Sequence, residues 1–400
     1  MRLGTANTYD LARSNLTSRQ AGLADLQDKL SAGKKVVRPS DDPTGAAQAE
    51  RAMTRLTRVD VEQRALNLQR NSMSAAEATL GDGLDLLQRF RELVINAGDG
   101  ALTSVNRSSI AQEMRSLRDQ IFTYANKQDS NGVPLFGGLG SASNPFTDVT
   151  SGVTFNGIPG QRASTTVGIP SALDGQAVWM NVPTGNGVFN LSLGGANTGQ
   201  LWTDVGQILN PSALTGDNYT ITFTVTATTP PVTTYDVLNT TTSTPVLPAA
   251  RPYVDGQDIQ FDGLSFIARG VPVNGDTVAI APSTRSDLFA VMDAAIAGID
   301  KKSNGHLLAQ STSLSLAQID SGMDRIQSAR GVAGELLKRA DIIDGNQEDK
   351  TIQLQADRSR AEDIDMIKGI SEFQNQQTGY DAALQTYAQI QRLSLFNYLG

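Results

Sequence analysis

A seven-residue repeat of apolar side chains constrains the fold of this chain more than any other feature of its sequence. The repeat runs without interruption through Ala52, Val59, Leu66, Met73, Leu80, Leu87 and Val94. Apolar side chains at this spacing lie along one side of an α-helix, and they need another helix to cover them. The sequence therefore predicts one long helix over residues 44–95 that packs against other helices.

The C-terminal stretch, residues 353–396, carries a weaker repeat of the same kind. Its first row holds Ile370, Gln377, Leu384 and Gln391, its second row holds Phe373, Tyr380 and Tyr387, and Leu395 and Phe396 follow. Glutamine and tyrosine make this seam weaker than a leucine zipper. We expect a helix here that needs a partner helix.

The N-terminal stretch has the pattern of such a partner. Tyr9, Leu16, Leu23 and Leu30 are seven residues apart, and Leu26 lies on the companion row. Because isolated helices of this length are marginal in water, the two stretches together are only weakly stable. We therefore predict that both are assembly seams, frayed in the free chain and ordered against other subunits.

A short polar linker follows the first helix, which we expect to end at Gly33. The linker ends with the sequence Pro39-Ser40-Asp41-Asp42-Pro43. Asp is a preferred N-cap residue, and Pro is preferred at the first helical position. Another carboxylate beside the cap suits the helix dipole. The linker is therefore predicted to be a capped loop ahead of the long helix.

Three further helices are expected from apolar spacing. Residues 104–127 follow a turn after the long helix and are predicted to form an antiparallel hairpin with it. Residues 287–300 begin at a Ser-Asp cap, and residues 312–344 carry another seven-residue repeat. Gly345-Asn346 is expected to end this last helix before the terminal one begins.

The composition changes between the two helical arms. Neither Lys nor Glu occurs between Gln128 and Lys301, although both are frequent on either side. Alternating Thr and apolar residues predict strands at 219–226, 258–261, 264–268 and 277–280, with a tight hairpin at Asp262-Gly263. Thr- and Pro-rich runs at 228–245 are expected to be exposed loops. Residues 131–285 are therefore predicted to form an all-β domain, a small sandwich or a partly open barrel.

The predicted fold class is α+β, a long antiparallel helical bundle or coiled coil built from both chain ends, with the all-β domain inserted. Three domains are expected. Residues 1–42 with 346–400 form a terminal coiled-coil domain for assembly, residues 43–130 with 286–345 form a helical bundle, and residues 131–285 form the outer domain.

Catalytic, cofactor and metal chemistry is not predicted for this chain. It has no cysteine, one histidine, His306, in a turn sequence, and none of the nucleotide-binding or hydrolase motifs. Three aspartates near the hairpin, Asp255, Asp258 and Asp262, fit turns better than a calcium loop. A net charge of −8 argues against a nucleic-acid surface, and no apolar run is long enough to span a membrane. The N-terminus lacks the apolar core of a signal peptide.

Both ends of the chain resemble the flagellin superfamily of bacterial flagellar axial proteins. The resemblance rests on Leu30-Ser31-Ala32-Gly33-Lys34-Lys35, on Arg38-Pro39-Ser40-Asp41-Asp42-Pro43-Thr44-Gly45-Ala46-Ala47, on Met1-Arg2-Leu3 and on Leu393-Ser394-Leu395-Phe396-Asn397-Tyr398-Leu399. The form of these motifs is most similar to the hook–filament junction proteins of the superfamily. The chain departs from the family pattern at Lys34-Lys35-Val36-Val37, and the β-domain carries no family signature.

The resemblance implies a structural protein without catalysis that joins the hook to the filament. It implies copies of the chain in a ring, a hook-associated protein on the hook side, and flagellin or a second junction protein on the filament side. It also implies a cytoplasmic export chaperone on the C-terminal seam. The location implied is extracellular, in the flagellum, after type III export without a cleaved signal.

Two other functions stay open at this point. The first is a flagellin that forms the filament itself. The second, from a different class, is an adhesin or glycan-binding β-domain on a helical stalk, which Trp179 and Trp202 would permit because aromatic rings stack on sugars.

Overall fold

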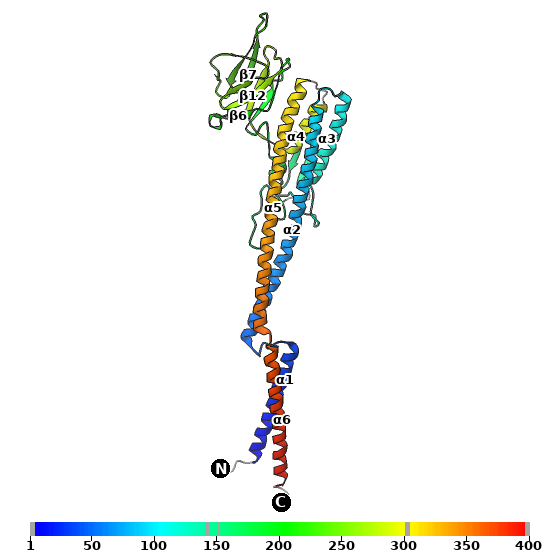
Figure 1. Ribbon diagram of the computed structural model, residues 1–400, viewed down its shortest axis with the longest axis vertical. Helices are drawn as coiled ribbons and strands as arrows, with labels where there is room; N and C mark the ends of the chain where they lie inside the picture. The colour runs from blue at the N-terminus through cyan, green and yellow to red at the C-terminus, as the bar shows by residue number, and fades with distance from the viewer. Residues whose placement is uncertain (1–4, 141–143, 151, 301–304, 397–400) are drawn as a thin grey trace. The chain divides into compact units, whose positions relative to one another are not determined.

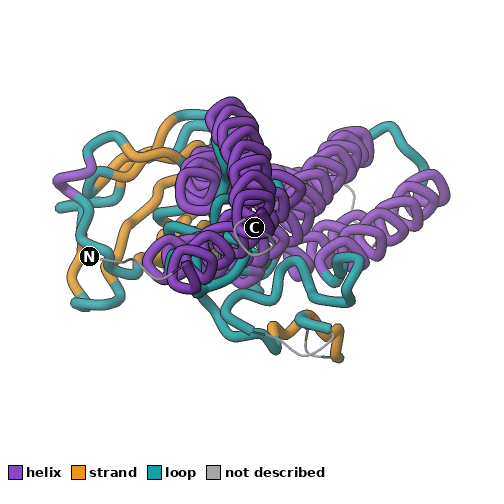
Figure 2. The backbone as a smooth tube through the Cα atoms, turned by 90° about the horizontal axis from the view of Figure 1, so that it is seen from below, coloured by secondary structure: helices purple, strands orange, loops and turns teal. Residues whose placement is uncertain are grey.

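The computed structural model describes residues 5–140, 144–150, 152–300 and 305–396, with side chains described only between residues 10 and 389. Figure 1 gives the order of the elements, and Figure 2 separates helices, in purple, from strands, in orange. The chain divides into two compact units. The first combines Met1–Ala65 with Ile342–Gly400, and the second is Leu66–Asp341.

The long repeat forms one helix, α2 (Pro43–Ala97), as predicted. All seven members of the repeat are buried, from Ala52 to Val94. The covering helix is α5 (His306–Glu362). In the second unit, ion pairs join Arg91 to Asp320 at 2.6 Å and Arg330 to Glu77 at 2.6 Å, which places the two helices antiparallel. Apolar rows that are far apart in the sequence therefore pair α2 with α5.

Helix α5 does not end at Gly345-Asn346, and that prediction is wrong. The helix continues for seventeen residues beyond Gly345, to Glu362. Its buried row, Ile319, Ile326, Ala333 and Ala340, also continues through Gln347, Leu354 and Ala361. A helical glycine costs only about 1 kcal/mol relative to alanine, and burial of this row outweighs that cost. The break comes at residues 363–365, ahead of α6 (Met366–Phe396).

Two shorter helices complete the helical part of the second unit. Helix α3 (Ser104–Ala125) begins at Thr103, whose side chain accepts a hydrogen bond from Asn106 N–H. Helix α4 (Leu288–Asp300) begins after Asp287, whose carboxylate accepts a 2.7 Å hydrogen bond from Ala290 N–H. The two helices pack against each other. Both predicted helices are therefore present, within two residues of their expected bounds at each end.

The β region consists of antiparallel strands. They are β1 (Phe146–Val149), β2 (Gly152–Phe155), β3 (Val182–Pro183), β4 (Phe189–Leu193), β5 (Trp202–Thr203), β6 (Gln207–Ile208), β7 (Tyr219–Val225), β8 (Thr233–Asn239), β9 (Thr244–Pro245), β10 (Arg251–Pro252), β11 (Asp258–Phe261), β12 (Leu264–Arg269), β13 (Thr277–Pro282) and β14 (Arg285–Ser286). A π-helix, η1 (Gln176–Met180), and a 3-10 turn, η2 (Pro211–Ala213), interrupt them. All four predicted strands are present.

Two sheets enclose one apolar core. The larger sheet has the order β10-β8-β7-β13-β4, with β9 also paired to β8, and the smaller has β11-β12-β5, with β6 also paired to β12. Ile221 and Phe223 of the larger sheet share a buried cluster with Phe266 of the smaller. The β11–β12 hairpin turns at Asp262 and Gly263, both with positive φ, as predicted. The inserted region therefore contains a sandwich.

The Thr- and Pro-rich runs at the two ends of 228–245 are exposed, and a strand that was not predicted lies between them. Residues 233–239 form β8, paired along its length with β7, and Thr244–Pro245 form β9. Alternate side chains of β8, from Tyr235 to Asn239, are buried. Threonine-rich composition hid this alternation, because threonine suits both strands and polar turns.

Replacing a glycine of α5 by alanine tests why this helix continues past Gly345. A Cβ at Gly345 would meet no atom within 4 Å, so Gly345→Ala is expected to raise the free energy of unfolding by about 0.5–1 kcal/mol. A Cβ at Gly322 would lie 2.7 Å from Cδ1 of the fully buried Leu288, so Gly322→Ala serves as the matched control and should not stabilise. Urea unfolding followed by circular dichroism measures both. A Gly345→Ala variant less stable than wild type would contradict the continuous helix.

Candidate assembly site

The two terminal helices pack against each other in the first unit. Helix α1 (Thr5–Ala32) lies beside α6, shown in blue and red in Figure 1. Leu16, Leu23, Leu26 and Leu30 of α1 are half-buried. The side chains of Tyr9, Gln391, Leu395 and Phe396 lie outside the described part of the chain. The structure therefore brings the two predicted seams together within one molecule, while their role in assembly stays a prediction.

Only one of the two predicted rows of α6 faces α1. Phe373, Tyr380 and Tyr387 are half-buried, whereas Ile370, Gln377 and Leu384 are exposed. The companion row consists instead of Gly369, Gln376 and Ala383, one residue earlier. Sequence analysis missed this row because glycine, glutamine and alanine give almost no apolar signal.

Side chains of each helix that pack against glycines of the other explain the choice of row. A Cβ at Gly369 would lie 2.9 Å from Cδ2 of Leu30, and a Cβ at Gly379 would lie 2.7 Å from Nη1 of Arg19. On α1, a Cβ at Gly22 would lie 3.1 Å from Oε1 of Gln376. Glycines on both helices therefore allow the pair to pack with little apolar burial.

This packing leaves an apolar strip of α6 uncovered within the chain. Its members are Ile367, 85 % exposed, Ile370, 46 % exposed, and Leu384, 42 % exposed. Leu11 of α1 is also exposed. Scattered exposed apolar residues are normal, but a strip on one helix marks a surface for association.

A backbone clasp joins the end of α1 to the break between α5 and α6. Lys35 N–H and Val36 N–H donate hydrogen bonds to Glu362 C=O, and Ile364 N–H donates to Gly33 C=O at 3.1 Å. Gly33 has φ +68°, a conformation that glycine adopts most readily. These bonds link segments that are more than 300 residues apart, so the clasp fixes where α1 can meet α6.

A charged pair reinforces the clasp. Lys34 Nζ lies 2.5 Å from Oε1 of Glu362, whose side chain is largely buried. The hydrogen bond from Lys34, together with that from Arg358, lowers the pKa of the Glu362 carboxyl, although burial opposes the shift. Glu362 is therefore held ionised within the clasp.

Two aspartates order the linker, and Pro39, Ser40 and Pro43 are exposed. Asp41 accepts hydrogen bonds from Arg38 N–H at 2.9 Å and Val37 N–H at 3.1 Å, which lower its pKa. Asp42 accepts from Gly45 N–H and from the Thr44 hydroxyl and N–H, which lower its pKa in the same way. Asp42 is thus the N-cap of α2.

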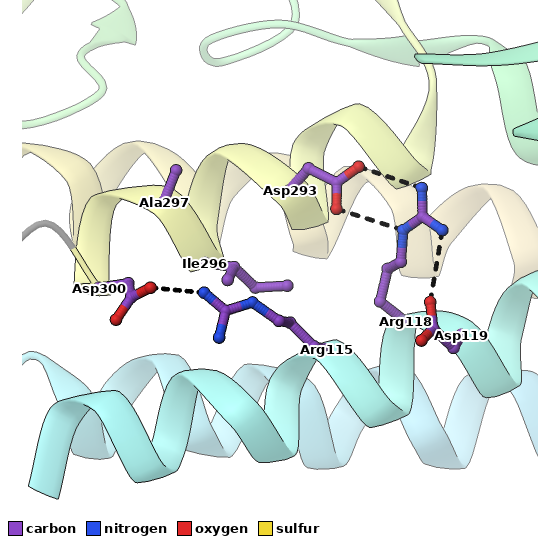
Figure 3. Close-up of a pocket in the computed structure, with 7 residues that line it drawn as sticks. All are labelled: Arg115, Arg118, Asp119, Asp293, Ile296, Ala297 and Asp300. Atoms are coloured by element: carbon purple, nitrogen blue, oxygen red, sulfur yellow. Dashed lines mark hydrogen bonds and ion pairs between the residues drawn. The ribbon is translucent and has the colours of Figure 1, made fainter. Parts of the chain in front are cut away.

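The second unit has a polar cleft between α3 and α4, with a volume of about 520 Å³. Figure 3 shows Arg115 paired with Asp300 at 2.5 Å and Arg118 paired with Asp293 and Asp119. The side chain of Arg118 is only 10 % exposed. Every carboxylate named here is already paired with an arginine, so the cleft offers no free acid or base for catalysis.

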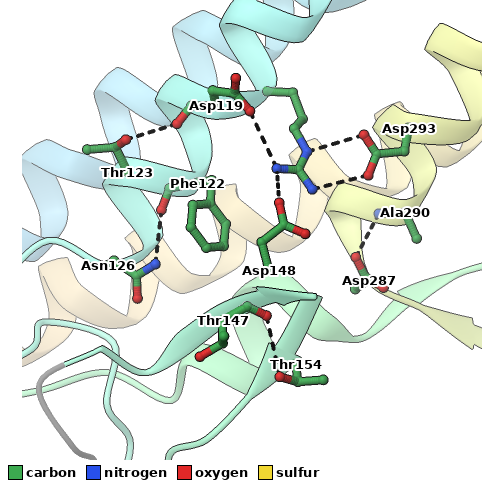
Figure 4. Close-up of polar contacts among 11 residues, drawn as sticks. Asp119, Phe122, Thr123, Asn126, Thr147, Asp148, Thr154, Asp287, Ala290 and Asp293 are labelled. Carbon is green, nitrogen blue, oxygen red and sulfur yellow. Dashed lines mark hydrogen bonds and ion pairs between the residues drawn. The ribbon is translucent and has the colours of Figure 1, made fainter. Parts of the chain in front are cut away.

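Arg118 also joins the helices to the first β-hairpin. Its guanidinium pairs with Asp148 of β1 (Figure 4). The guanidinium also lies 5.7 Å from the ring centroids of both Phe122 and Phe289. Burial by itself lowers the pKa of Arg118, but the hydrogen bonds to Asp148 and Asp293 outweigh it, so the net shift is upward. The cleft is therefore a structural tie.

Other chemistry is not found in the described ranges. They contain no group of three or more His, Cys, Asp and Glu side chains placed to hold a metal ion. Among their helices, none combines the length and the apolar character that crossing a bilayer requires. Of the three hairpin aspartates, Asp255 accepts a hydrogen bond from Gly270 N–H and Asp262 accepts one from the Tyr219 hydroxyl.

Sequence comparison with protein families matches both arms of the chain. The bacterial flagellin N-terminal helical region matches residues 5–141, and the bacterial flagellin C-terminal helical region matches residues 316–399. Together they cover more than half of the chain. The segment between them includes the sandwich.

Curated relatives and solved structures agree with this match. The chain is 32 % identical over 160 residues to flagellar hook-associated protein 3 of Salmonella typhimurium, covering 38 % of this chain and 48 % of that one. The corresponding Escherichia coli protein is 31 % identical over 152 residues, covering 37 % and 47 %. The match thus spans about half the length of these relatives.

Among solved structures, flagellar hook-associated protein 3 of Legionella pneumophila superposes with a TM-score of 0.71 at 27 % identity, covering 77 % of this chain and 97 % of that one. The Legionella flagellar junction protein FlgL gives a TM-score of 0.68 at 28 % identity, covering 74 % and 99 %.

Removing the charge of Glu362 is expected to change how stability depends on pH. Because the folded pKa of Glu362 is lowered, its contribution is complete above the ordinary glutamate pKa, about 4.3, and is lost as pH falls through the folded value. Glu362→Gln should melt earlier than wild type at pH 7, and the difference should shrink as pH falls below the ordinary glutamate pKa and through the lower folded value. Asp357→Asn, on the same helix but away from Lys34, is the control. Parallel melting curves for Glu362→Gln and wild type across this range would contradict the charged clasp.

Replacing Arg118 should destabilise the second unit. Arg118→Leu leaves Asp148 and Asp293 without their partner, and we expect a loss of roughly 2–4 kcal/mol in the free energy of unfolding. Arg115→Leu, which removes a half-exposed pair with Asp300, is the control and should cost less than about 1 kcal/mol. Equal losses in the two variants, measured by urea unfolding, would show that Arg118 has no special role.

Proposed function

This chain belongs to the bacterial flagellin family, and we propose that it is a structural subunit of the flagellum that joins the hook to the filament. The observation that carries the proposal is the α1–α6 pair, which lies in the family-matched ends and leaves an apolar strip of α6 uncovered. The likeness to a protein described as a flagellar junction protein, over nearly all of that protein's length, favours the junction over the filament itself.

The proposed partners follow from that role. Copies of the chain would form a ring, with a hook-associated protein on the hook side and flagellin or a second junction protein on the filament side. A cytoplasmic export chaperone would cover the α6 strip before export, because Ile370 and Leu384 would otherwise promote aggregation. The finished ring would be extracellular, with residues 1–42 and 346–400 inside, residues 43–130 and 286–345 around them, and residues 131–285 outermost.

A structural role without catalysis agrees with the chemistry of the described residues. The arginines and carboxylates of the polar cleft between α3 and α4 neutralise one another, and the perturbed pKa values of Asp41, Asp42 and Glu362 result from caps and clasps. Each of these groups holds one segment of the chain against another.

Two alternatives are weaker. A filament-forming flagellin is compatible with the family match, and deletion of the gene separates the two. Glycan binding through Trp179 is not supported, because its ring is fully buried between Phe136 and Phe289. Trp202 is half-buried and lies 5.8 Å from the guanidinium of Arg269, so it offers no open platform either.

Deletion and complementation test the proposal. Cells without the chain should keep hooks, shed flagellin into the medium and lose motility, and the wild-type gene should restore filaments. Ile370→Ser/Leu384→Ser should fail to restore them, because the exposed strip loses its apolar side chains without disturbing the folded core.

The matched control is Val105→Ser, which changes a 72 %-exposed apolar residue on α3 and should restore filaments fully. Deletion cells with hooks but no shed flagellin would identify the chain as the filament protein. Full motility with the double variant would overturn the role of the α6 strip.

A further inference from the structure

The first unit carries unpaired charges of opposite sign on two sides of one helix pair. The pair consists of residues 43–65 of α2 and residues 342–362 of α5. A groove of about 390 Å³ runs between the two helices on one side, with Arg51 and Arg55 on one wall and Leu354 and Ala361 toward its floor. We call this the basic side.

Three cations on the basic side have no carboxylate partner within the described residues. The ion pairs along this segment join Arg58 to Glu62, Arg64 to Asp60, Arg358 to Glu362 and Arg360 to Asp357. Arg51, Arg55 and Lys350 are exposed and take part in none of them. Lys350 precedes the groove residue Asp357 by seven residues, so it lies on the same row of α5.

The opposite side of the pair carries unpaired carboxylates. Asp344 accepts a 3.1 Å hydrogen bond from Gln63 Nε2 but has no cation beside it, and Glu348 follows four residues later on the same strip. On α2, Arg55 precedes the buried Val59 by four residues and Gln63 follows it by four, so they flank the buried row on opposite sides. We call the strip of Asp344 and Glu348 the acidic side.

We propose that neighbouring copies of this chain contact each other side by side here, the basic side of one copy against the acidic side of the next. Arg51, Arg55 and Lys350 of one molecule would face Asp344 and Glu348 of its neighbour. A contact between two different surfaces repeats from copy to copy, and it closes into a ring when the rotation is right. This inference rests on the proposed function, since it names the surfaces by which the copies assemble.

Charge complementarity selects a second copy as the occupant. The same segment supplies both signs, so no other chain is needed to neutralise either side. Exposed pairs of this kind are individually weak and are screened by salt. They set register and exclude like-charged neighbours more than they add affinity.

Cysteine cross-linking tests the contact, since the chain has no cysteine of its own. The gene with Arg55→Cys/Glu348→Cys is expressed in cells that lack the chain, and isolated flagella are oxidised and run on a non-reducing gel. We expect a ladder of dimers and higher multimers. Arg55→Cys alone and Glu348→Cys alone should each give monomer only, because the two sides differ.

Each other cross-linking result would overturn the proposal. Dimers from a single-cysteine variant would mean that like sides meet. A cross-linked band containing a different protein would mean that the occupant is not a second copy. Monomer only from the double variant, in flagella that contain the chain, would mean that these sides do not touch.

Charge reversal gives an independent measurement. Arg51→Glu/Arg55→Glu should lower the amount of chain in isolated flagella by roughly tenfold, because acidic sides would then face each other. Adding Asp344→Lys/Glu348→Lys in the same chain should restore assembly, as complementarity returns with reversed sign. Failure of the fourfold variant to recover, with a thermal melt like that of wild type, would overturn the contact.

The two hypotheses fail in different ways. If the wild-type chain is absent from flagella, or its deletion leaves filaments intact, the proposed function fails. If the wild-type chain is present and required but both charge reversals assemble normally, only the side-by-side contact fails.

Discussion

The antiparallel pairing of α2 with α5 is the interaction on which both units depend. Each helix presents one buried row at seven-residue spacing, and no cysteine contributes to the pairing. Ion pairs at the edges, such as Arg91–Asp320, penalise any slip in register, because a slip would separate the charges. Helices α3 and α4, which pack against each other, and the β-sandwich all lie in the chain segment between α2 and α5, so the insertion begins and ends on this helix pair.

The clasp at residues 33–36 and 360–364 holds the two ends of the chain against each other. Helices α1 and α6 bury little apolar surface against one another, and the glycines at their interface contribute none. Backbone hydrogen bonds to Glu362 and Gly33, with the Lys34–Glu362 pair, hold the ends in place instead. Such bonds depend on few side chains, so they tolerate variation in the helices on either side.

Periodicity made the long helices predictable from sequence, and its absence explains each error. The seven-residue repeat from Ala52 to Val94 predicts a long helix, and Asp42 and Pro43 are residue types that helix starts prefer. Gly345 resembled a helix end because the nearby sequence does not show that a distant segment buries Gln347 and Leu354. The α1-facing row of α6 was placed one residue late for a similar reason, since Gly369 and Gln376 matter through close approach. Strand β8 was hidden because its threonines also suit turns.

The two units can be compared by the ion pairing of their charged side chains and the burial of their large apolar ones. In the second unit, Arg91, Arg118 and Arg330 all find carboxylates within the chain, and large aromatic side chains such as Trp179 are fully buried. In the first unit, Arg51, Arg55, Asp344 and Glu348 have no ionic partner among the described side chains, and Ile367 is almost wholly exposed. Uncovered apolar surface carries a free-energy cost that a neighbouring copy can relieve, and exposed charges of opposite sign select which surfaces meet. The first unit therefore holds both surfaces that we propose for assembly, the α6 strip and the oppositely charged sides of the α2–α5 pair.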